Sequence, residues 1–455
     1  MEGQTADTLS FAERANLHLW IAASLIVAHV ALRAAGAHEL LLVWLVVAAI
    51  LSVVNPTGGL TVLASIAPFP EGVPLVGEAG SKSVLAAVLA ASVALRWLLD
   101  RPIRRPPLPV ILAVVLLGAT SLGLLRTLDR WGAEYALGAA HAWFQGVATM
   151  LLAFVAAVWV AQRGSLAPLV ATLAATTIAG IVSLLDYWGQ GAAREFIGWA
   201  LADPFVPARL TGVIRSPTST AALVTIPALF FLTATVLGRD IRLRVAGAVL
   251  AAPLLVAAYL TYNRAVLVAL FVWAVVVAWR IRRALGVLVL VIGIAASLLL
   301  VPWYMSVRGD AVGAGGLPAA GEVLPASDAQ RVNAWITAGR MFLDEPIIGQ
   351  GYRAYRQLAV EFGEPTITAP HNEWLRLFAE HGLIVGMIGL AFAATTAWFI
   401  SRPPGWLSAA LLASFLSVCV AASFNNTFLF NQVMIPALIL AGTGVARALP
   451  STGRA

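Results

Sequence analysis

Three arginines and one histidine in this 455-residue chain have the types and positions best suited to chemistry. Arg209 and Arg215 precede an apolar run, Arg264 lies in a turn between two runs, and His371 follows Pro370 at the start of another. A guanidinium group is planar, permanently charged, and binds phosphate oxygens with paired hydrogen bonds. A histidine titrates near neutral pH and takes a proton from an attacking hydroxyl. Together they predict a site for a diphosphate leaving group.

Each of these residues also has an ordinary structural interpretation. An arginine near the end of a membrane span commonly anchors that end at the lipid headgroups, and this alternative stays open for all three arginines. A histidine after a proline is commonly a helix cap, and we expect His371 to cap the helix that follows. The helix dipole would then disfavour its protonated form. Arg331 is expected to be solvated or to brace a nearby loop.

The composition requires that membrane-spanning helices position these residues. Hydrophobic residues make up 60% of the chain and charged residues 11%, with a mean hydropathy of +0.88. A soluble domain has roughly 25% charged residues, and about 20 apolar residues cross the ~30 Å hydrocarbon core. We therefore predict an all-α polytopic bundle of about 12 to 14 spans. The apolar runs lie near 17–34, 40–54, 83–99, 108–125, 141–161, 165–187, 217–237, 245–262, 265–280, 284–301, 382–400, 405–424 and 428–446, with a Pro- and Gly-interrupted stretch at 56–70 that predicts a broken or re-entrant helix.

The formal charge of +7 does not indicate nucleic acid, because of where the basic residues lie. They cluster in short links between apolar runs, which is the pattern of cytoplasmic loops. Because successive spans cross the membrane in alternating directions, the segments on the non-cytoplasmic side are then 126–140, 188–216, 261–264 and 302–371. The lone Cys419 excludes an intrachain disulfide framework, and no metal or cofactor is expected. The clustered residues are Arg101, Arg104, Arg105, Arg239, Arg242, Arg244, Arg280, Arg282 and Arg283.

The segment 302–371 is the longest predicted stretch outside the bilayer. After a Gly-, Ala- and Pro-rich part, Ser327 and Gln330 resemble a capping box that opens an amphipathic helix, with Val332 and Ile336 on one face. Pro346 ends it. A second short helix is predicted to contain Tyr352, Tyr355 and Arg356. Two such helices beside a membrane bundle predict a lid at the interface.

The order of these motifs resembles the superfamily of O-antigen ligases, O-antigen polymerases (Wzy-type) and O-oligosaccharyltransferases. The resemblance covers about 207–390 and begins with Arg209-x-x-Gly212 before a Pro-containing turn and a span. The turn reads Ser216-Pro217-Thr218 where the family often has Asn-Pro-Asn, so Arg209 is favoured as the family's first arginine and Arg215 as a second contact. The outer loop has the pattern Arg331-x-x-x-Trp335 … Pro346-x-x-Gly349-x-Gly351 … His371-Asn372-x-x-Leu375 … Glu380-x-Gly382-x-x-Gly386.

The resemblance implies a glycosyltransferase of the GT-C type in the bacterial inner membrane, acting on the periplasmic face without a metal. Its donor would be a glycan on undecaprenyl diphosphate, and its acceptor a hydroxyl of lipid A–core or another glycan. Arg209 or Arg215, with Arg264, would hold the diphosphate. His371 would be the base, or would orient the diphosphate or acceptor. Arg331, Asn372 and Glu380 would support the lid.

We expect four regions: N-terminal membrane helices at 1–206, core membrane helices at 207–301, the periplasmic lid at 302–371 and C-terminal membrane helices at 372–455. An O-antigen ligase is the first expectation and a polymerase the alternative. An oligosaccharyltransferase is less expected, because those proteins usually carry an extra C-terminal region and this chain ends at Ala455. A transporter of a small solute such as bicarbonate is a second alternative, which intramembrane charges along a transport path or inverted repeats would favour. A scaffold without catalysis is a third, and it would predict tolerance of changes at Arg264 and His371.

Overall fold

The computed structural model describes residues 21–32 without 22 and 30, 38–69, 74–76, 79–99, 106–189, 209–296 without 215, 323–364, 368–427 and 430–449. These residues are mostly helical, with one small antiparallel pair of strands, β1 (Pro74–Val76) and β2 (Ala79–Gly80). The predicted all-α membrane fold class is therefore confirmed.

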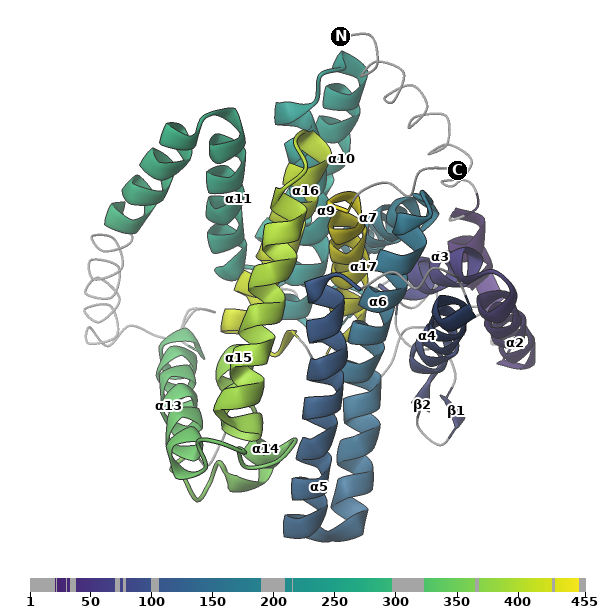
Figure 1. The fold of residues 1–455 in the computed structure, drawn as a ribbon. Coiled ribbons are helices and arrows are strands. Elements are labelled where there is room, and N and C mark those ends of the chain that lie inside the picture. The colour runs from purple at the N-terminus through teal and green to yellow at the C-terminus, as the bar shows by residue number, and fades with distance from the viewer. Residues whose placement is uncertain are drawn as a thin grey trace.

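The helices form one bundle, with a pair of long arms and two further helices at one end (Figure 1). In chain order they are α2 (His38–Val54), α3 (Pro56–Ile66), α4 (Ser81–Leu99), α5 (Leu108–Trp143), the π-helical turn η1 (Phe144–Ala148), α6 (Thr149–Gln162), α7 (Ala167–Trp188), α9 (Pro217–Leu237), α10 (Ile241–Leu260), α11 (Ala265–Ile281), α13 (Val323–Asp344), α14 (Ala354–Leu358), α15 (Glu373–Ser401), α16 (Trp406–Phe424) and α17 (Asn431–Arg447).

Seven helical stretches among the described residues are long and apolar enough to cross a membrane. One of them, Leu108–Gln162, is 55 residues long and forms two antiparallel arms, because Gly132 leaves the helical conformation with φ 77° and ψ 179°. Four shorter apolar helices also occur, including Pro56–Ile66 and Ala265–Ile281. The predicted number of about 12 to 14 spans is larger than seven, because it counts the two arms of Leu108–Gln162 separately and includes the shorter apolar helices. It also counts the 17–34 run, which lies partly outside the described residues.

The interrupted stretch at 56–70 forms one short buried helix, α3. Asn55 caps its N-terminus by accepting from the Gly58 amide at 3.3 Å, and Pro56 occupies the first helical position. At the other end, the ammonium group of the buried Lys82 donates to the carbonyls of Ala67, at 3.0 Å, and Phe69. The chain's single lysine thus satisfies carbonyls that the end of a helix leaves without partners.

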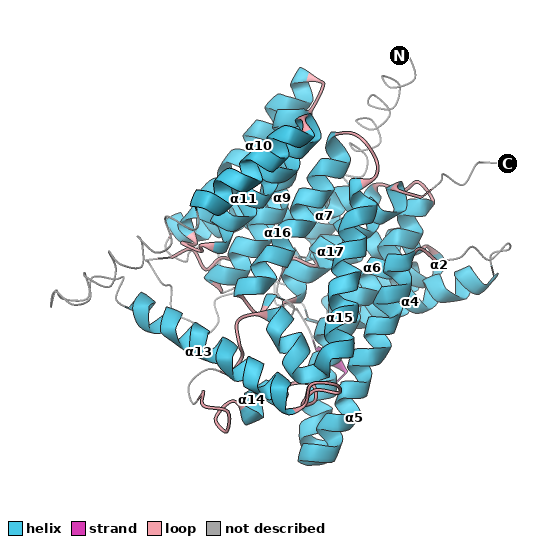
Figure 2. Ribbon diagram, turned by 60° about the vertical axis from the view of Figure 1, so that its left-hand side comes forward, coloured by secondary structure: helices cyan, strands magenta, loops and turns pink. Residues whose placement is uncertain are grey.

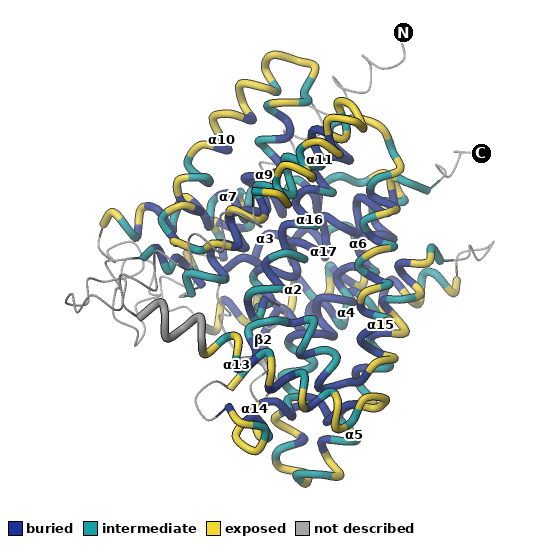
Figure 3. Tube along the Cα trace, turned by 90° about the vertical axis from the view of Figure 1, so that its left-hand side faces the viewer, coloured by how far each residue is buried: buried dark blue, intermediate teal, exposed yellow. Residues whose placement is uncertain are grey.

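The buried core lies where α6, α9, α15, α16 and α17 meet (Figure 3). Helix α17 packs closely on α6, because a Cβ added to Gly442 would lie 2.8 Å from the Phe154 carbonyl oxygen. Helix α16 is joined to α9 by a hydrogen bond from the Ser414 hydroxyl to the Ile226 carbonyl, 2.9 Å long. Small and hydroxyl-bearing residues allow such close packing between membrane helices.

Helix α11 runs antiparallel to α16, which fixes which helix ends lie together. At the end of α11, Arg280 donates to the carbonyls of Ser401, at 2.8 Å, and Pro403, at 3.0 Å, in the link that precedes α16. Along their length the two helices pack through Ala269 and Ala413. The start of α11 therefore lies at the end of the bundle where α16 finishes. The described arginine-rich links, 238–244 and 280–283, lie at the opposite end of the bundle.

Helix α13 lies obliquely beside α15, with α14 below it (Figure 2). It begins at Val323, so the predicted start at Ser327 was wrong: the helix extends one turn further into the Gly/Ala/Pro-rich stretch. Its protein-facing side contains Ala334, Ala338 and Met341, all buried. The second helix, α14, contains Tyr355 and Arg356 as predicted, whereas Tyr352 precedes it.

The opposite side of α13 is apolar and exposed. Val332, Ile336 and Leu343 lie on this side, which continues into Ile347 and Ile348 after the helix ends. A helix beside a membrane bundle with one apolar face on protein and another outward is suited to the lipid–water interface.

The α5 arm anchors the lid segment on its other side. Glu345 accepts from Arg126 at 2.5 Å and from Arg130 at 3.2 Å. The Tyr352 amide donates to the Gly123 carbonyl at 3.2 Å, and the Thr127 hydroxyl donates back to the Tyr352 carbonyl at 2.9 Å. The turn after α13 is therefore held by both backbone and charged contacts.

Candidate functional site

Arg209 lies against the turn that carries Arg264. Its Nε donates to the Thr261 carbonyl at 3.1 Å, and the next amide, of Leu210, donates to the Leu260 carbonyl at 2.9 Å. Burial lowers the pKa of Arg209, and the positive charge of Arg331 lowers it further. The first predicted arginine motif is thus joined to the second by main-chain contacts.

The Arg209-x-x-Gly212 motif has a structural reason for its glycine. Gly212 has a φ of 59°, and a Cβ there would come within 2.6 Å of the Ser183 hydroxyl. The same hydroxyl accepts from the Val213 amide at 3.2 Å. Ser216 then caps α9, with Pro217 at its first position. Arg215 lies outside the described residues.

The turn at 261–264 is tightly determined by its own side chains. Tyr262 has a φ of 49°, and the Asn263 carboxamide accepts from the Ala265 amide at 3.0 Å. Arg264 is the N-cap residue of α11 and is exposed. An arginine at a helix N-terminus adds its charge to the positive end of the helix dipole. The position therefore favours the binding of an anion beside Arg264.

His371 precedes the cap of α15 rather than forming it. Asn372 is the cap, accepting from the amides of Trp374 and Leu375 at 3.1 Å each. The prediction that His371 caps the helix was therefore wrong, because the shorter amide side chain reaches these donors. His371 takes the left-handed conformation, with a φ of 52°. Its Nδ1 lies 3.3 Å from Nδ2 of Asn426.

Arg331 on α13 influences both the arginine and the histidine parts of the site. The pKa of His371 lies below its ordinary value of 6.5, first because the ring is buried and second because of the charge of Arg331. The same charge acts on Arg209. Arg331 is therefore within electrostatic range of both residues. The structure brings Arg209, Arg264, Arg331 and His371 to the same end of the bundle.

A buried ion cluster supports the start of α15. Arg376 pairs with Glu373 at 2.7 Å and lies 4.0 Å from Glu380. Glu380 also accepts from the Tyr355 amide at 3.4 Å, which joins α15 to α14. Arg376 follows Glu373 by three positions and precedes Glu380 by four, which are the spacings of neighbours on one helix face. Sequence reasoning assigned a support role only to Glu380, although this spacing could have indicated the whole cluster.

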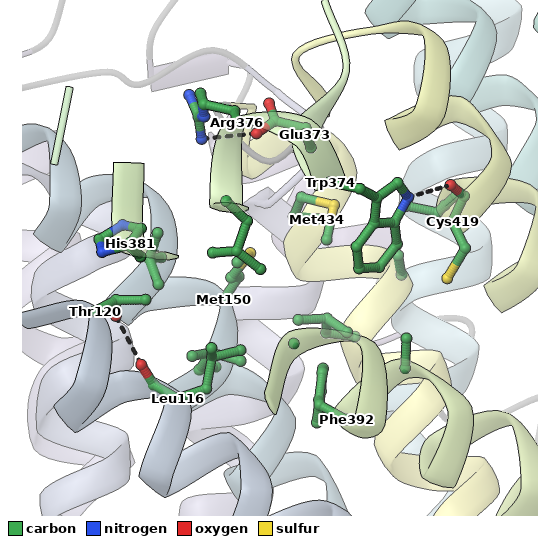
Figure 4. Close-up of a pocket in the computed structure, with 18 of the residues that line it drawn as sticks. Leu116, Thr120, Met150, Glu373, Trp374, Arg376, His381, Phe392, Cys419 and Met434 are labelled. Atoms are coloured by element: carbon green, nitrogen blue, oxygen red, sulfur yellow. Dashed lines mark hydrogen bonds and ion pairs between the residues drawn. The ribbon is translucent and has the colours of Figure 1, made fainter. Parts of the chain in front are cut away.

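The ion cluster lines one side of a largely apolar cavity. Figure 4 shows Glu373, Arg376 and His381 at one side and apolar residues such as Leu116 and Phe392 at the other. It is bounded by the α5–α6 arms and by α15, α16 and α17. Trp374 crosses its rim and donates to the Cys419 carbonyl at 3.3 Å. Sequence analysis did not find this cavity, because its walls come from separate apolar runs.

The fold and the site define a polytopic membrane protein with arginines and one histidine gathered at one end of the bundle. Residues 248–390 match the family described as O-antigen ligase. This match confirms the resemblance drawn from the motifs for residues 248–390, and it supports a membrane enzyme with the glycosyltransferase-like activity that the family implies. The matched segment includes Arg264, Arg331, His371 and Glu380. No curated protein matches the chain.

Proposed function

We propose that this protein is an O-antigen ligase that transfers a glycan from undecaprenyl diphosphate to a hydroxyl of lipid A–core. The observation that carries the proposal is the gathering of Arg209, Arg264, Arg331 and His371 at one end of the bundle. Cations of this kind suit a leaving group whose negative charge grows as its bond breaks. The periplasmic face of the inner membrane is the proposed location, because the arginine-rich links lie at the opposite end.

The proposed reaction is a single inverting displacement. The acceptor hydroxyl oxygen attacks the anomeric carbon, His371 takes the hydroxyl proton, and the bond from that carbon to the diphosphate oxygen breaks. Undecaprenyl diphosphate leaves with the bonding electrons, next to Arg209 and Arg264. No metal is assigned to a step. Because its pKa is lowered, His371 is neutral at pH 7 and able to accept the proton.

The tautomer of His371 decides whether its outward nitrogen can act as a base. If Asn426 donates to Nδ1, Nε2 keeps the proton and His371 can only donate to the substrate. If the Asn426 amide is turned so that Oδ1 accepts from Nδ1–H, Nε2 has a free lone pair. The proposed mechanism uses this second arrangement.

The first test is a transfer assay with purified protein in detergent. It contains undecaprenyl-diphosphate-linked glycan and lipid A–core, with a metal chelator present, and products are separated on gels. Wild type is compared with Arg264→Ala, with His371→Asn, and with Arg242→Ala as a control arginine at the opposite end. A glycosylated lipid A–core that is lost in the first two variants alone is the expected result.

The assay also tests the alternative, a polymerase of the same superfamily. Longer lipid-linked chains without modified lipid A–core would identify that activity. Near-normal transfer by Arg264→Ala would refute the proposed site. If the wild type moved no glycan to either acceptor, the transferase proposal would fail.

A further inference from the structure

The connection between α16 and α17 contains several polar side chains that are buried without hydrogen-bond partners. Asn425 is 4% exposed, Thr427 1% and Asn431 7%. Among the described residues, both side-chain polar atoms of Asn425 lack a partner, as do Thr427 Oγ1, Asn431 Oδ1 and the atom of the Asn426 carboxamide that does not face His371. We call these four residues the amide cluster. It lies beyond the segment that matches the family.

Such a cluster is costly to the fold. A buried donor or acceptor without a partner loses its hydrogen bonds to water and gains none in return, and folded proteins keep few of them. Several serines and threonines within α16 and α17 instead donate their hydroxyl group to a carbonyl of their own helix. Thr443 on α17, for example, donates to the Ile439 carbonyl one turn earlier at 2.9 Å. The amide cluster departs from this pattern in one short connection.

One member of the amide cluster, Asn426, lies directly next to His371. The Nδ2 of Asn426 is 3.3 Å from the histidine Nδ1. The neighbouring contact from Trp374 to the Cys419 carbonyl holds the start of α15 against the last turns of α16 (Figure 4). Because α11 runs antiparallel to α16, the turn that contains Arg264, at the start of α11, lies at the same end of the bundle as the last turn of α16. In that turn, Nδ2 of Asn263 is also buried without a partner.

We propose that the amide cluster binds sugar hydroxyl groups and holds the glycan beside His371. A carboxamide and a hydroxyl both donate and accept hydrogen bonds, which matches the vicinal hydroxyls of a pyranose ring. The cluster is neutral, whereas a diphosphate is better matched by the guanidinium groups of Arg209 and Arg264. This inference rests on the proposed function and assigns its sugar-binding residues. The sugar belongs either to the donor or to the acceptor.

The test replaces buried polar atoms with apolar ones of similar size, in Asn425→Leu and, more conservatively, Thr427→Val. Replacing an unpartnered buried group with an apolar one of the same shape is neutral or stabilising for the fold. Loss of one sugar hydrogen bond of about 1.4 kcal/mol weakens binding about tenfold. We therefore expect an unchanged or higher Tm together with a KM raised about tenfold. The matched control is Thr443→Val on α17, which should leave KM unchanged.

Separate titrations of the two substrates assign the sugar. A raised KM for the lipid-linked glycan alone assigns the cluster to the donor, and one for lipid A–core alone assigns it to the acceptor. An unchanged KM for both in Asn425→Leu and Thr427→Val would overturn the proposal, whether Tm rises, falls or stays constant. A fall in Tm with unchanged kinetics would show a structural role only.

A binding measurement separates failure of this inference from failure of the proposed function. Lipid-free glycan released from the donor is added to each protein, and the shift in Tm is recorded. A shift in wild type that is lost in Asn425→Leu supports the cluster even if no transfer occurs. Equal shifts in wild type and both variants, or no shift in wild type at millimolar glycan, would overturn the inference.

Discussion

Gly349 and Gly382 lie with their backbones in direct contact, and this contact docks the lid segment on α15. A Cβ on Gly349 would be 2.4 Å from the Gly382 nitrogen, and one on Gly382 would be 2.1 Å from the Ile347 carbonyl oxygen. Both have positive φ values, 76° and 75°. Hydrogen bonds from Gln350 to the Ala379 carbonyl and from Gly351 to the Glu380 carbonyl, 3.0 and 2.9 Å, flank the contact.

Alanine at either glycine should therefore destabilise the protein. Gly349→Ala and Gly382→Ala each combine a left-handed backbone with a contact to main chain that cannot move aside. We expect a loss of about 1–3 kcal/mol or more in the free energy of unfolding, seen as a lower Tm in detergent. Gly339→Ala in α13 is the control, because a Cβ there meets nothing within 4 Å. It should be neutral or stabilising. Equal stability of all three variants would contradict the interpretation.

The pH dependence of transfer should follow the lowered pKa of His371. In the proposed mechanism the neutral ring is the base, so the rate should level off above pH 6.5 and fall as the pH drops through the folded-state pKa, which lies below that value. The unfolded chain takes up the proton at about 6.5, so stability should also decline below this pH. Rates measured from pH 5 to 8 test this. A midpoint well above 6.5 would be inconsistent with the burial of the ring.

His371→Asn is the variant that isolates the loss of the base. Asparagine tolerates the left-handed conformation that His371 adopts, so the backbone should be retained. We expect transfer to fall by about 10²–10⁴-fold and the acid limb of the pH profile to disappear. A pH profile that keeps the wild-type acid limb in this variant would assign that limb to another group.

Asn426→Asp should change the protonation of His371 without removing its neighbour. A carboxylate near Nδ1 accepts from Nδ1–H and favours the protonated ring, so the acid limb of the rate should move to higher pH. Asn426→Leu, which makes no hydrogen bond, should lower kcat without that shift. Identical pH profiles for Asn426→Asp and wild type would show that the 3.3 Å contact does not influence the histidine.

The ion cluster of α15 should be sensitive to the removal of its cation. Arg376→Met leaves Glu373 and Glu380 buried without their positive partner, which should cost about 3–5 kcal/mol. Adding Glu373→Gln and Glu380→Gln removes both charges, and most of the lost stability should return. Thermal unfolding of the single and triple variants checks this. A triple variant no more stable than Arg376→Met would show that packing, rather than charge, dominates.

The sidedness of the site is open to direct labelling. In a Cys419→Ala background, Ala133→Cys lies in the exposed turn between the α5 arms, and Pro404→Cys lies in the exposed link before α16. In intact cells with a permeabilised outer membrane, an impermeant maleimide should label Ala133→Cys. It should label Pro404→Cys only after the inner membrane is opened. The reverse pattern would place the proposed site in the cytoplasm.

Much of the membrane architecture could be predicted from the sequence, because apolar runs and arginine-rich links are properties of consecutive residues. Ser216 and Pro217 at the start of α9 are a local signal of the same kind. The start of α13 was missed because helix formation there extends into a stretch rich in glycine and alanine. Which face of α13 meets protein could not be predicted either: lipid and protein interiors are both apolar, so Val332 and Ala334 give no distinguishing signal.

The site itself was only partly predictable. The motifs indicated Arg209, Arg264 and His371, and the family match covers Arg264 and His371 but begins after Arg209. The contact between His371 and Asn426 joins residues far apart in the sequence, and the polar link between two apolar runs has the composition of an ordinary loop. The amide cluster is recognisable only because folding leaves its polar atoms buried, which local sequence does not reveal.

The outward apolar face of α13 has a consequence for how substrates reach the site. A helix that rests on the bilayer surface through this face would set the proposed site at the height of the lipid headgroups, where the sugar of the proposed lipid-linked donor would also lie. Such a substrate stays in its own leaflet and searches a plane instead of a volume. The protein would then meet lipid-anchored glycans far more often than free glycans, since a glycan without a lipid anchor is diluted through the surrounding solution.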